Sequence, residues 1–308
     1  MLRYYILTSR NLPCLKRHFH SVPKKHTTVV VNTTDQEYER AASEWCFENK
    51  INCVVTESNG KPGKGKNAVL DHFLDSSYDY MVQIDGDDFL QPHGVNLYWW
   101  LSENNPPDGV QIVYGRCWSG EVENPDELYA PFPWDDNFKE WVENTVTSEE
   151  RPHFDYMYEH REEYKELYDI HCHDNFTWNY PLDSVHFMDC ARLIFWSRKL
   201  ASSVRFREDL LIGEDALLNY EVRDMAWKKR IELRKVQDSR EKTYSYDLLN
   251  SGIVKKSQRD ANWEWLKDIN EAIAEASKNW TVPQTFRLAP VVHNLKRTEE
   301  LNLGDLNE

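Results

Sequence analysis

One short stretch, residues 80–88, constrains this chain more than any other. The apolar run 80–84 leads directly into an acidic turn at 85–88, which holds three aspartates and one glycine. A buried strand that ends in this way delivers its carboxylates to the C-terminal edge of a sheet, where open α/β sheets bind ligands. Carboxylates so close together repel one another, and their hard oxygen atoms suit Mg²⁺ or Mn²⁺. The stretch therefore indicates a metal site, with an ordinary polar turn as the alternative because Asp and Gly are common turn residues.

Strand and helix patterns alternate around this stretch. The β-branched run at 27–31 is typical of a strand, and the apolar spacing at 12–20 is typical of a helix with one buried face. The same reasoning predicts strands at 2–8, 27–31, 51–56, 80–84 and 110–114, and helices at 12–20, 36–49, 67–74 and 95–102. Strands separated by helices of this length indicate βαβ units and a mostly parallel sheet flanked by helices.

The pattern breaks at residues 118–180, which are acidic, aromatic and interrupted by prolines. We interpret this segment as an insertion that covers the site and not as a separate domain. Regular patterns return at 185–196, which fits two strands or a strand and the start of a helix. Further helices are expected at 216–227 and 261–278, and the polar end of the chain, 298–308, is expected to be frayed.

Bulk composition narrows the function class. The formal net charge of −15 argues against a general nucleic-acid binder, because such proteins need a basic surface. The six cysteines are scattered without a Cys-x-x-Cys pair, as in proteins of a reducing compartment. The N-terminal apolar run is too short for a signal peptide, and no apolar run approaches transmembrane length. These observations predict a soluble, cytoplasmic protein.

Two other motifs precede helix-like segments. The run 63–66 alternates Gly and Lys, and at a helix start its backbone N–H groups and two cations suit a phosphate group. A solvated, flexible loop is the alternative for that run. The triplet 213–215, Gly-Glu-Asp, opens the helix at 216–227. Its carboxylates offer either a cap on the helix dipole or a rigidly held general base.

Taken together, the three motifs resemble the nucleotide-sugar half of GT-A glycosyltransferases, especially glycosyltransferase family 2. In that family a basic residue before Asn-Ala opens a helix, as Lys66 does here, and the next strand ends in an Asp-x-Asp metal motif. The triplet 213–215 is similar to the family's Glu-Asp motif. The resemblance covers about residues 2–116 and 185–230.

The resemblance implies an α/β, Rossmann-like GT-A sheet within one catalytic domain at residues 1–260. Its parts would be a nucleotide-sugar-binding half at 1–116, an insertion or lid at 117–184 and an acceptor half at 185–260, followed by a C-terminal helix and tail at 261–308. The implied reaction is metal-dependent, inverting transfer of a sugar from a nucleotide-diphospho sugar to an acceptor hydroxyl. A UDP-sugar is the favoured donor, and the acceptor would be a glycan, a lipid-linked molecule or a small molecule.

The resemblance also implies roles for individual residues. A divalent cation, Mn²⁺ or Mg²⁺, would be held by Asp85, Asp87 and Asp88 and would bridge the diphosphate. Asp215 would take the proton of the acceptor hydroxyl, and Glu214 would help to bind the acceptor. The residues expected to contact the nucleotide or its diphosphate are Thr8, Arg10, Asp35, Lys64, Lys66, Asp85 and, in a late loop that closes over the site, Lys255.

Three positions depart from the family pattern. The family's Asp that reads the base directly follows the second strand, whereas residues 32–34 intervene before Asp35 here. The basic residue before Asn-Ala is usually Arg, and here it is Lys66. Many GT-A enzymes use a late His as a further metal ligand, and only the distant His293 could serve. The nucleotide and the full ligand set therefore stay open.

Other functions would keep the same fold. A transferase of this kind could act on a modified DNA base, which would have to be flipped out of the duplex. Basic stretches at 223–235 and 255–259 suggest this acceptor, and the acidic net charge weighs against it. A nucleotidyltransferase shares the sheet and the acidic metal site. A non-catalytic nucleotide-sugar-binding protein is a further alternative, which the intact Asp85, Asp87 and Asp215 disfavour.

Overall fold

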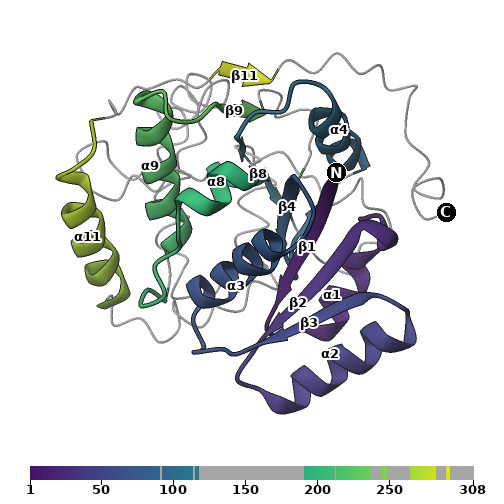
Figure 1. Cartoon of the computed structure of the whole chain (residues 1–308). Coiled ribbons are helices and arrows are strands. Elements are labelled where there is room, and N and C mark those ends of the chain that lie inside the picture. Colours follow the sequence, from purple (N-terminus) through teal and green to yellow (C-terminus); the bar gives the residue numbers. More distant parts are fainter. Residues whose placement is uncertain are drawn as a thin grey trace, which may run out of the picture.

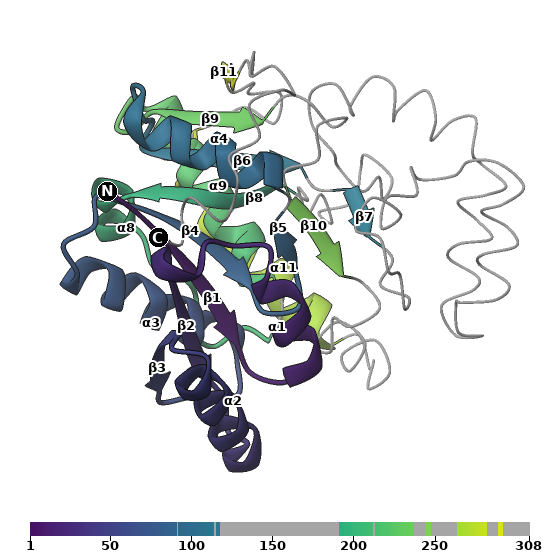
Figure 2. The ribbon, with the colours of Figure 1, turned by 90° about the vertical axis from the view of Figure 1, so that its right-hand side faces the viewer.

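The computed structural model of the chain describes residues 1–90, 92–113, 115–117, 191–211, 213–236, 244–247, 264–281 and 289–291. Within these ranges, a mixed sheet lies between two layers of helices (Figure 1), and a small second sheet stands beside it (Figure 2). Most of the predicted insertion, together with Lys255 and His293, lies outside the described residues.

The main sheet holds eight described strands in the order β11-β9-β6-β8-β4-β1-β2-β3. They are β1 Leu2–Thr8, β2 Thr27–Asn32, β3 Asn52–Thr56, β4 Tyr80–Asp85, β6 Gly109–Val113, β8 Ala191–Ser197, β9 Leu233–Val236 and β11 Ala289–Val291. Neighbouring strands are parallel except at β8, which runs antiparallel to both β4 and β6. Because β4, β1 and β2 are parallel neighbours, their carboxyl ends meet at one edge of the sheet.

Helices cover both faces of this sheet (Figure 1). They are α1 Leu12–Phe19, the 3₁₀ helix η1 Lys24–His26, α2 Gln36–Glu48, α3 Pro62–Asp75, α4 Pro92–Glu103, α8 Arg198–Ser203, α9 Glu214–Trp227 and α11 Glu264–Ser277. Successive strand residues point to opposite faces, so Tyr4 and Ile6 of β1 pack with α1, α2 and α4, whereas Tyr5 packs with α3, α8 and α9. Within the described ranges, no helix has the length and apolar character that crossing a bilayer requires.

The second sheet consists of β5 Phe89–Leu90, β10 Tyr244–Asp247 and β7 Gly115–Cys117, in the order β5-β10-β7. β10 is antiparallel to β5 and parallel to β7. Since β5 directly follows the acidic turn 85–88, this sheet brings a late segment of the chain next to that turn (Figure 2).

The predicted α/β architecture is confirmed, and each predicted strand before residue 114 agrees with an observed strand to within one residue at either end. Segment 185–196 yields one described strand, β8, followed by helix α8. The predicted starts of two helices were wrong: the helix expected from residue 67 begins at Pro62, so residues 63–66 lie inside α3 and not in a loop, and the helix expected from residue 95 begins at Pro92. Proline suits the first position of a helix, and close packing of Gly63 holds the next turn in place. A Cβ atom at Gly63 would lie only 2.0 Å from the Arg207 carbonyl oxygen.

Candidate active site

The acidic turn lies at the carboxyl end of β4, against the end of β1. Asp85 is the last residue of β4 and is in register with Leu7 of β1. The turn is tight, because the Asp88 N–H donates to the Asp85 carbonyl at 2.9 Å and the Gly86 N–H donates to the Leu7 carbonyl at 2.7 Å. A Cβ atom at Gly86 would lie 2.8 Å from the Cβ of Thr8, so this crossing requires glycine.

Asp85 and Asp88 share a buried guanidinium. Arg192 Nη1 donates to Asp85 Oδ2 at 2.6 Å and to Asp88 Oδ2 at 3.1 Å. The antiparallel register of β8 explains this contact, because it pairs Val82 with Phe195. Asp85 comes three residues after Val82, and Arg192 comes three residues before Phe195, so the two stand opposite each other. Only 6% of the Arg192 side chain is exposed, and the Asp88 side chain is fully buried.

Tyr244 of β10 completes this network from the second sheet. Its hydroxyl donates to Asp88 Oδ2 and accepts from the Asp85 N–H at 3.4 Å. The Arg192 guanidinium lies over the Tyr244 ring, with Cζ 5.1 Å from the ring centroid. The network therefore ties β4, β8 and β10 together at one end of the sheet.

The two paired aspartates differ in pKa. Burial alone would raise the pKa of Asp85, but the Arg192 and Lys66 cations outweigh it and lower that pKa to about 2. The pKa of Asp88 is raised well above its ordinary value, first by complete burial and then by the neighbouring Asp87 carboxylate, although Arg192 opposes this. Asp85 is consequently ionised at any physiological pH.

The acidic turn has the donor atoms that a divalent cation requires. One carboxylate oxygen from each of Asp85, Asp87 and Asp88 lies within 4.8 Å of the other two. Hard oxygen atoms at this spacing fit Mg²⁺ or Mn²⁺. Asp87 is half-buried; burial lowers the pKa of Arg10, and the Asp87 charge opposes that shift only in part. Among the described residues, this cluster is the candidate metal centre.

The second group of predicted residues opens helix α9. Gly213 adopts a left-handed conformation, φ 84°, which turns the chain into the helix and places Glu214 and Asp215 in its first turn. Lys66 Nζ lies 2.6 Å from Glu214 Oε1 and 3.8 Å from Asp215 Oδ2. The Lys66 and Glu214 side chains are 6% and 5% exposed, whereas 42% of the Asp215 side chain is exposed. The pair is buried, and Asp215 is left open to solvent.

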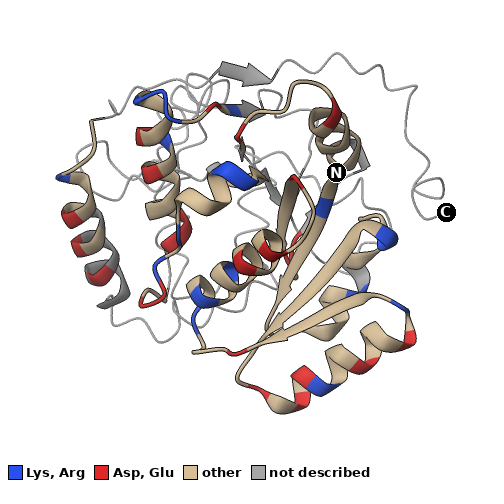
Figure 3. Ribbon diagram, in the orientation of Figure 1, with Lys and Arg blue, Asp and Glu red and all other residues tan. Residues whose placement is uncertain are grey.

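Lys66 connects this helix start to the acidic turn. Burial lowers the pKa of the Lys66 ammonium, but the Glu214, Asp215 and Asp85 carboxylates outweigh burial, and the net shift is upward. The same ammonium thus interacts with carboxylates from α9 and from β4. Figure 3 shows the basic start of α3 beside the acidic start of α9. The two motifs, far apart in sequence, meet at one end of the sheet.

Asn67 fixes the segment that leads to α9. Its side-chain amide donates to the Phe206 carbonyl at 3.0 Å and accepts from the Phe206 N–H at 2.9 Å. The amide thus pairs both backbone groups of Phe206, as a neighbouring strand would. The same amide donates to Glu208 Oε1 at 2.8 Å. Nearby, Lys61 Nζ donates to the Asp209 carbonyl at 2.6 Å. These contacts hold the start of α9 against α3.

The remaining residues expected at a nucleotide have local partners in the structure. Thr8 is buried and forms a short hydrogen bond with the Tyr38 hydroxyl. Asp35 caps α2 by accepting from two backbone N–H groups of its first turn. Lys64 Nζ lies 3.4 Å from Glu57 Oε2. Thr8 thus lies beside the acidic turn, while Asp35 and Lys64 stand at the starts of α2 and α3.

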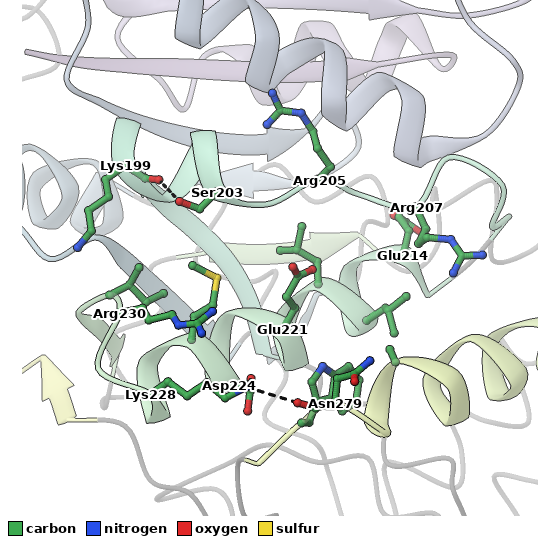
Figure 4. Close-up of a pocket in the computed structure, with 16 residues that line it drawn as sticks. Lys199, Ser203, Arg205, Arg207, Glu214, Glu221, Asp224, Lys228, Arg230 and Asn279 are labelled. Atoms are coloured by element: carbon green, nitrogen blue, oxygen red, sulfur yellow. Dashed lines mark hydrogen bonds and ion pairs between the residues drawn. The ribbon is translucent and has the colours of Figure 1, made fainter.

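A separate cavity is lined in part by Glu214. It measures about 760 Å³ and lies between α8, α9 and α11 (Figure 4). Its lining includes Glu214, Glu221 and Arg230 but none of the three aspartates of the acidic turn and not Asp215. It is therefore distinct from the acidic turn.

Arg192 and Tyr244 are the site residues that sequence reasoning missed. Arg192 directly precedes the apolar run 193–196. A single cation at the start of a buried strand is the sequence feature that could have indicated its role. Tyr244 precedes the late loop that is expected to close over the site, and it belongs to strand β10. Its contact with Asp88 depends on a second sheet that no local pattern predicts.

Comparison with known proteins gives structural matches only. No protein-family model matches the sequence, and no curated protein matches it significantly. S. aureus TarS 1–349 in complex with UDP-GlcNAc aligns over 92% of this chain and 68% of its own, with a TM-score of 0.51 and 14% identity. The chain has the GT-A glycosyltransferase fold.

Two further solved structures align with lower scores. The full S. aureus TarS structure covers 92% of this chain at 13% identity, with a TM-score of 0.49. The chain spans only 41% of the length of that protein. Mannosyltransferase PcManGT from Pyrobaculum calidifontis, in complex with GDP-Man and Mn²⁺, covers 90% of this chain and 68% of its own at 14% identity, with a TM-score of 0.45. Both of these structures score below 0.5, so the fold assignment depends on the TarS 1–349 complex with UDP-GlcNAc.

Proposed function

We propose that the chain transfers a sugar from a nucleotide-diphospho sugar to the hydroxyl group of an acceptor, with inversion at the anomeric carbon. The observation that carries this proposal is the position of Lys66, whose ammonium pairs with Glu214 and Asp215 and also interacts with Asp85. A general-base candidate and an acidic metal-binding turn therefore stand at one end of the sheet, as a displacement reaction requires.

On this proposal, the acidic turn is the donor side. Asp85 and Asp87 would hold a divalent cation against the two phosphates of the donor. When bound, such a cation supplies positive charge that stabilises the departing diphosphate. Arg10, which interacts with Asp87, stands on the same side. The chain thus offers both fixed carboxylates and a nearby cation for a diphosphate.

Asp215 is the acceptor side. Its half-exposed carboxylate takes the proton of the acceptor hydroxyl while that oxygen forms a bond to the anomeric carbon. The bond from the anomeric carbon to the phosphate oxygen breaks, and the nucleoside diphosphate leaves with the electron pair. Glu214 is held by Lys66, so it fixes the start of α9. A single displacement from the side opposite the leaving group gives inversion.

Binding of nucleoside diphosphates tests the donor side. Calorimetric titration of the full chain with UDP and with GDP should give binding that Mn²⁺ strengthens, and Asp87→Asn should remove the Mn²⁺ effect. UDP-GlcNAc is the first complete donor to try, because TarS 1–349 was solved with it. Asp71→Asn, an exposed carboxylate on α3, is the matched control. No binding of either nucleotide, with or without Mn²⁺, would contradict the proposal.

The acceptor side needs a separate test. Asp215→Asn should lower the transfer rate about 100- to 10,000-fold, the usual contribution of a general base, while nucleotide affinity is preserved. Product analysis also separates the main alternatives, since a nucleotidyltransferase releases pyrophosphate and a sugar transferase releases a nucleoside diphosphate. Transfer at an undiminished rate by Asp215→Asn would show that another group takes the proton.

A further inference from the structure

One edge of the main sheet is open. β3 is the last strand in the sheet order, and among the described strands it has a neighbour, β2, on one side only. Its five residues include no charge, no proline and no bulge, which are the usual means of protecting an exposed edge strand. Val55 in this strand is 47% exposed. β3 therefore offers outward-facing backbone N–H and C=O groups to another strand.

Helix α2 lies beside this edge and carries an exposed stripe (Figure 1). On one flank of the helix, Trp45 packs edge-on against Phe19 of α1. The other flank faces β3, because Ser43 lies beside the Cys53 thiol. Phe47, one turn after Ser43, is 85% exposed. The residues on this flank, which we call the edge stripe, follow helical spacing: Gln36, Arg40, Ser43 and Phe47.

We propose that β3 pairs with β3 of a second copy of this chain, antiparallel, about a two-fold axis at Val54. The two main sheets then form one continuous sheet. On the side of α2, Cys53 of each copy stands opposite Val55 of the other, and both positions neighbour core residues of β2. Asn52 stands opposite Thr56 in the same register. The inference goes beyond the proposed function, because it uses no residue of the acidic turn or of α9.

The dimensions of the fold support this pairing. Neighbouring strands are about 4.8 Å apart. Because α2 packs over both β2 and β3, its axis lies about one strand spacing from the two-fold axis. The two copies of α2 are then about 10 Å apart, which is a distance at which helices pack. A continuous sheet thus brings the two edge stripes into contact.

The same register makes the edge stripes complementary to each other. Cys53 lies beside Ser43, so Val54, the next residue of β3, stands level with the middle of α2. The two copies of α2 run antiparallel across the axis, and each Phe47 meets the N-terminal half of the other helix, around Arg40. The exposed ring is then covered by the aliphatic part of an arginine, whose guanidinium can lie over its face.

Charge favours a second copy as the occupant of this edge. A net charge of −15 makes two copies repel each other in general, but β3 is uncharged and the edge stripe holds one cation and no carboxylate. Lys50 and Glu57 stand four residues before and three residues after Val54. Antiparallel pairing therefore brings Lys50 of each copy next to Glu57 of the other. Both are exposed, and 90% of the Glu57 side chain stays accessible despite its contact with Lys64.

Sedimentation velocity of the purified full chain tests the pairing, at concentrations from about 1 to about 100 μM. The mass should rise with concentration from 36.6 kDa to twice that value. Val55→Lys adds a charge beside the axis and should raise the dissociation constant of the dimer about tenfold or more. Val55→Ile, the matched control, should change that constant by less than about threefold, since it keeps a β-branched apolar side chain.

The edge stripe has a test of its own. Phe47→Ser should also weaken the dimer. Trp100→Ser removes an exposed aromatic ring from α4 and should leave the dimer unchanged. Circular dichroism confirms that each variant is folded. A wild type that stays at 36.6 kDa, a dimer that Val55→Lys leaves intact, or an assembly that grows beyond two copies would overturn the proposal.

Charge reversal tests the register. At low salt, Lys50→Glu and Glu57→Lys should each weaken the dimer, because each variant places like charges side by side at both ends of the paired strands. The double variant Lys50→Glu/Glu57→Lys restores opposite charges and should bind more tightly than either single variant. A double variant that dimerises no better than the single variants would contradict pairing about Val54.

Discussion

Replacement of Lys66 by Met removes one partner of a buried ion pair. Lys66 Nζ and Glu214 Oε1 are 2.6 Å apart, and about one-twentieth of each side chain is exposed. Methionine matches the length and volume of lysine, so the change removes the charge and leaves the packing nearly intact. Glu214 then remains in the interior without the ammonium group that donates to it.

The expected loss of stability is large. Breaking a buried pair by removing one partner costs about 3–5 kcal/mol, because the remaining charge stays desolvated. Asp215 at 3.8 Å and the acidic turn lose their interaction with the same ammonium, so the upper part of this range is expected. With a urea m value of about 3 kcal/mol/M, the unfolding midpoint should fall by about 1 M or more.

Urea unfolding followed by circular dichroism measures this change. Lys64→Met is the matched control, because Lys64 lies two residues away on α3 and its pair with Glu57 is 3.4 Å long with 90% of the Glu57 side chain exposed. Such exposed pairs contribute about 0–1 kcal/mol. The double variant Lys66→Met/Glu214→Met should recover most of the loss, since an apolar pair can replace a buried ion pair.

Two results would refute this reasoning. A loss below 1 kcal/mol in Lys66→Met, equal to that in Lys64→Met, would mean that Glu214 is not buried against a cation. A double variant that is less stable than Lys66→Met would mean that Glu214 gains its stability from another partner.

Three other predictions follow from local geometry. Gly63→Ala should lower the melting temperature and the transfer rate together, because the added Cβ would meet the Arg207 carbonyl oxygen at 2.0 Å and push the start of α9 away; differential scanning calorimetry and a transfer assay check it. The pKa of Asp85 is lowered to about 2, so the ionised carboxylate should stabilise the fold at pH values above the ordinary Asp pKa of about 3.9. This contribution to stability should be lost as pH falls from 4 to 2, and Asp85→Asn should therefore flatten the acid limb of a stability-versus-pH curve. A hydrogen bond from the buried Cys46 lowers the pKa of the Cys53 thiol, so alkylation of Cys53 should reach half its maximal rate at a lower pH than an ordinary thiol does; a midpoint above the ordinary Cys pKa of about 8.5 would contradict this contact.

Much of the fold is predictable because its signals are local. The β-branched run 27–31 and the apolar run 80–84 each specify a buried strand, and the alternation with helices specifies a parallel sheet. The acidic turn can be located for the same reason, as it directly follows a strand. The start of α3 was missed because Gly63 and Gly65 have low helix propensity. Packing of Gly63 against Arg207 overrides that propensity.

The pairing of site residues could not be predicted in the same way. Arg192 reaches Asp85 because β8 lies antiparallel beside β4, and no local sequence pattern predicts that strand order. Tyr244 reaches Asp88 through a second sheet built from three distant segments. Lys66 was expected at a phosphate, and its contact with Glu214 depends on where α9 packs. Each of these contacts joins residues at least 100 positions apart.

A crystal structure of the chain with Mn²⁺ and UDP tests the central claim most directly. The account predicts one Mn²⁺ about 2.1 Å from an oxygen of Asp87, with the diphosphate on that ion and Asp215 facing it across the same cleft. A nucleotide bound in the cavity between α8, α9 and α11, or a metal on the far side of the sheet from Asp215, would contradict it.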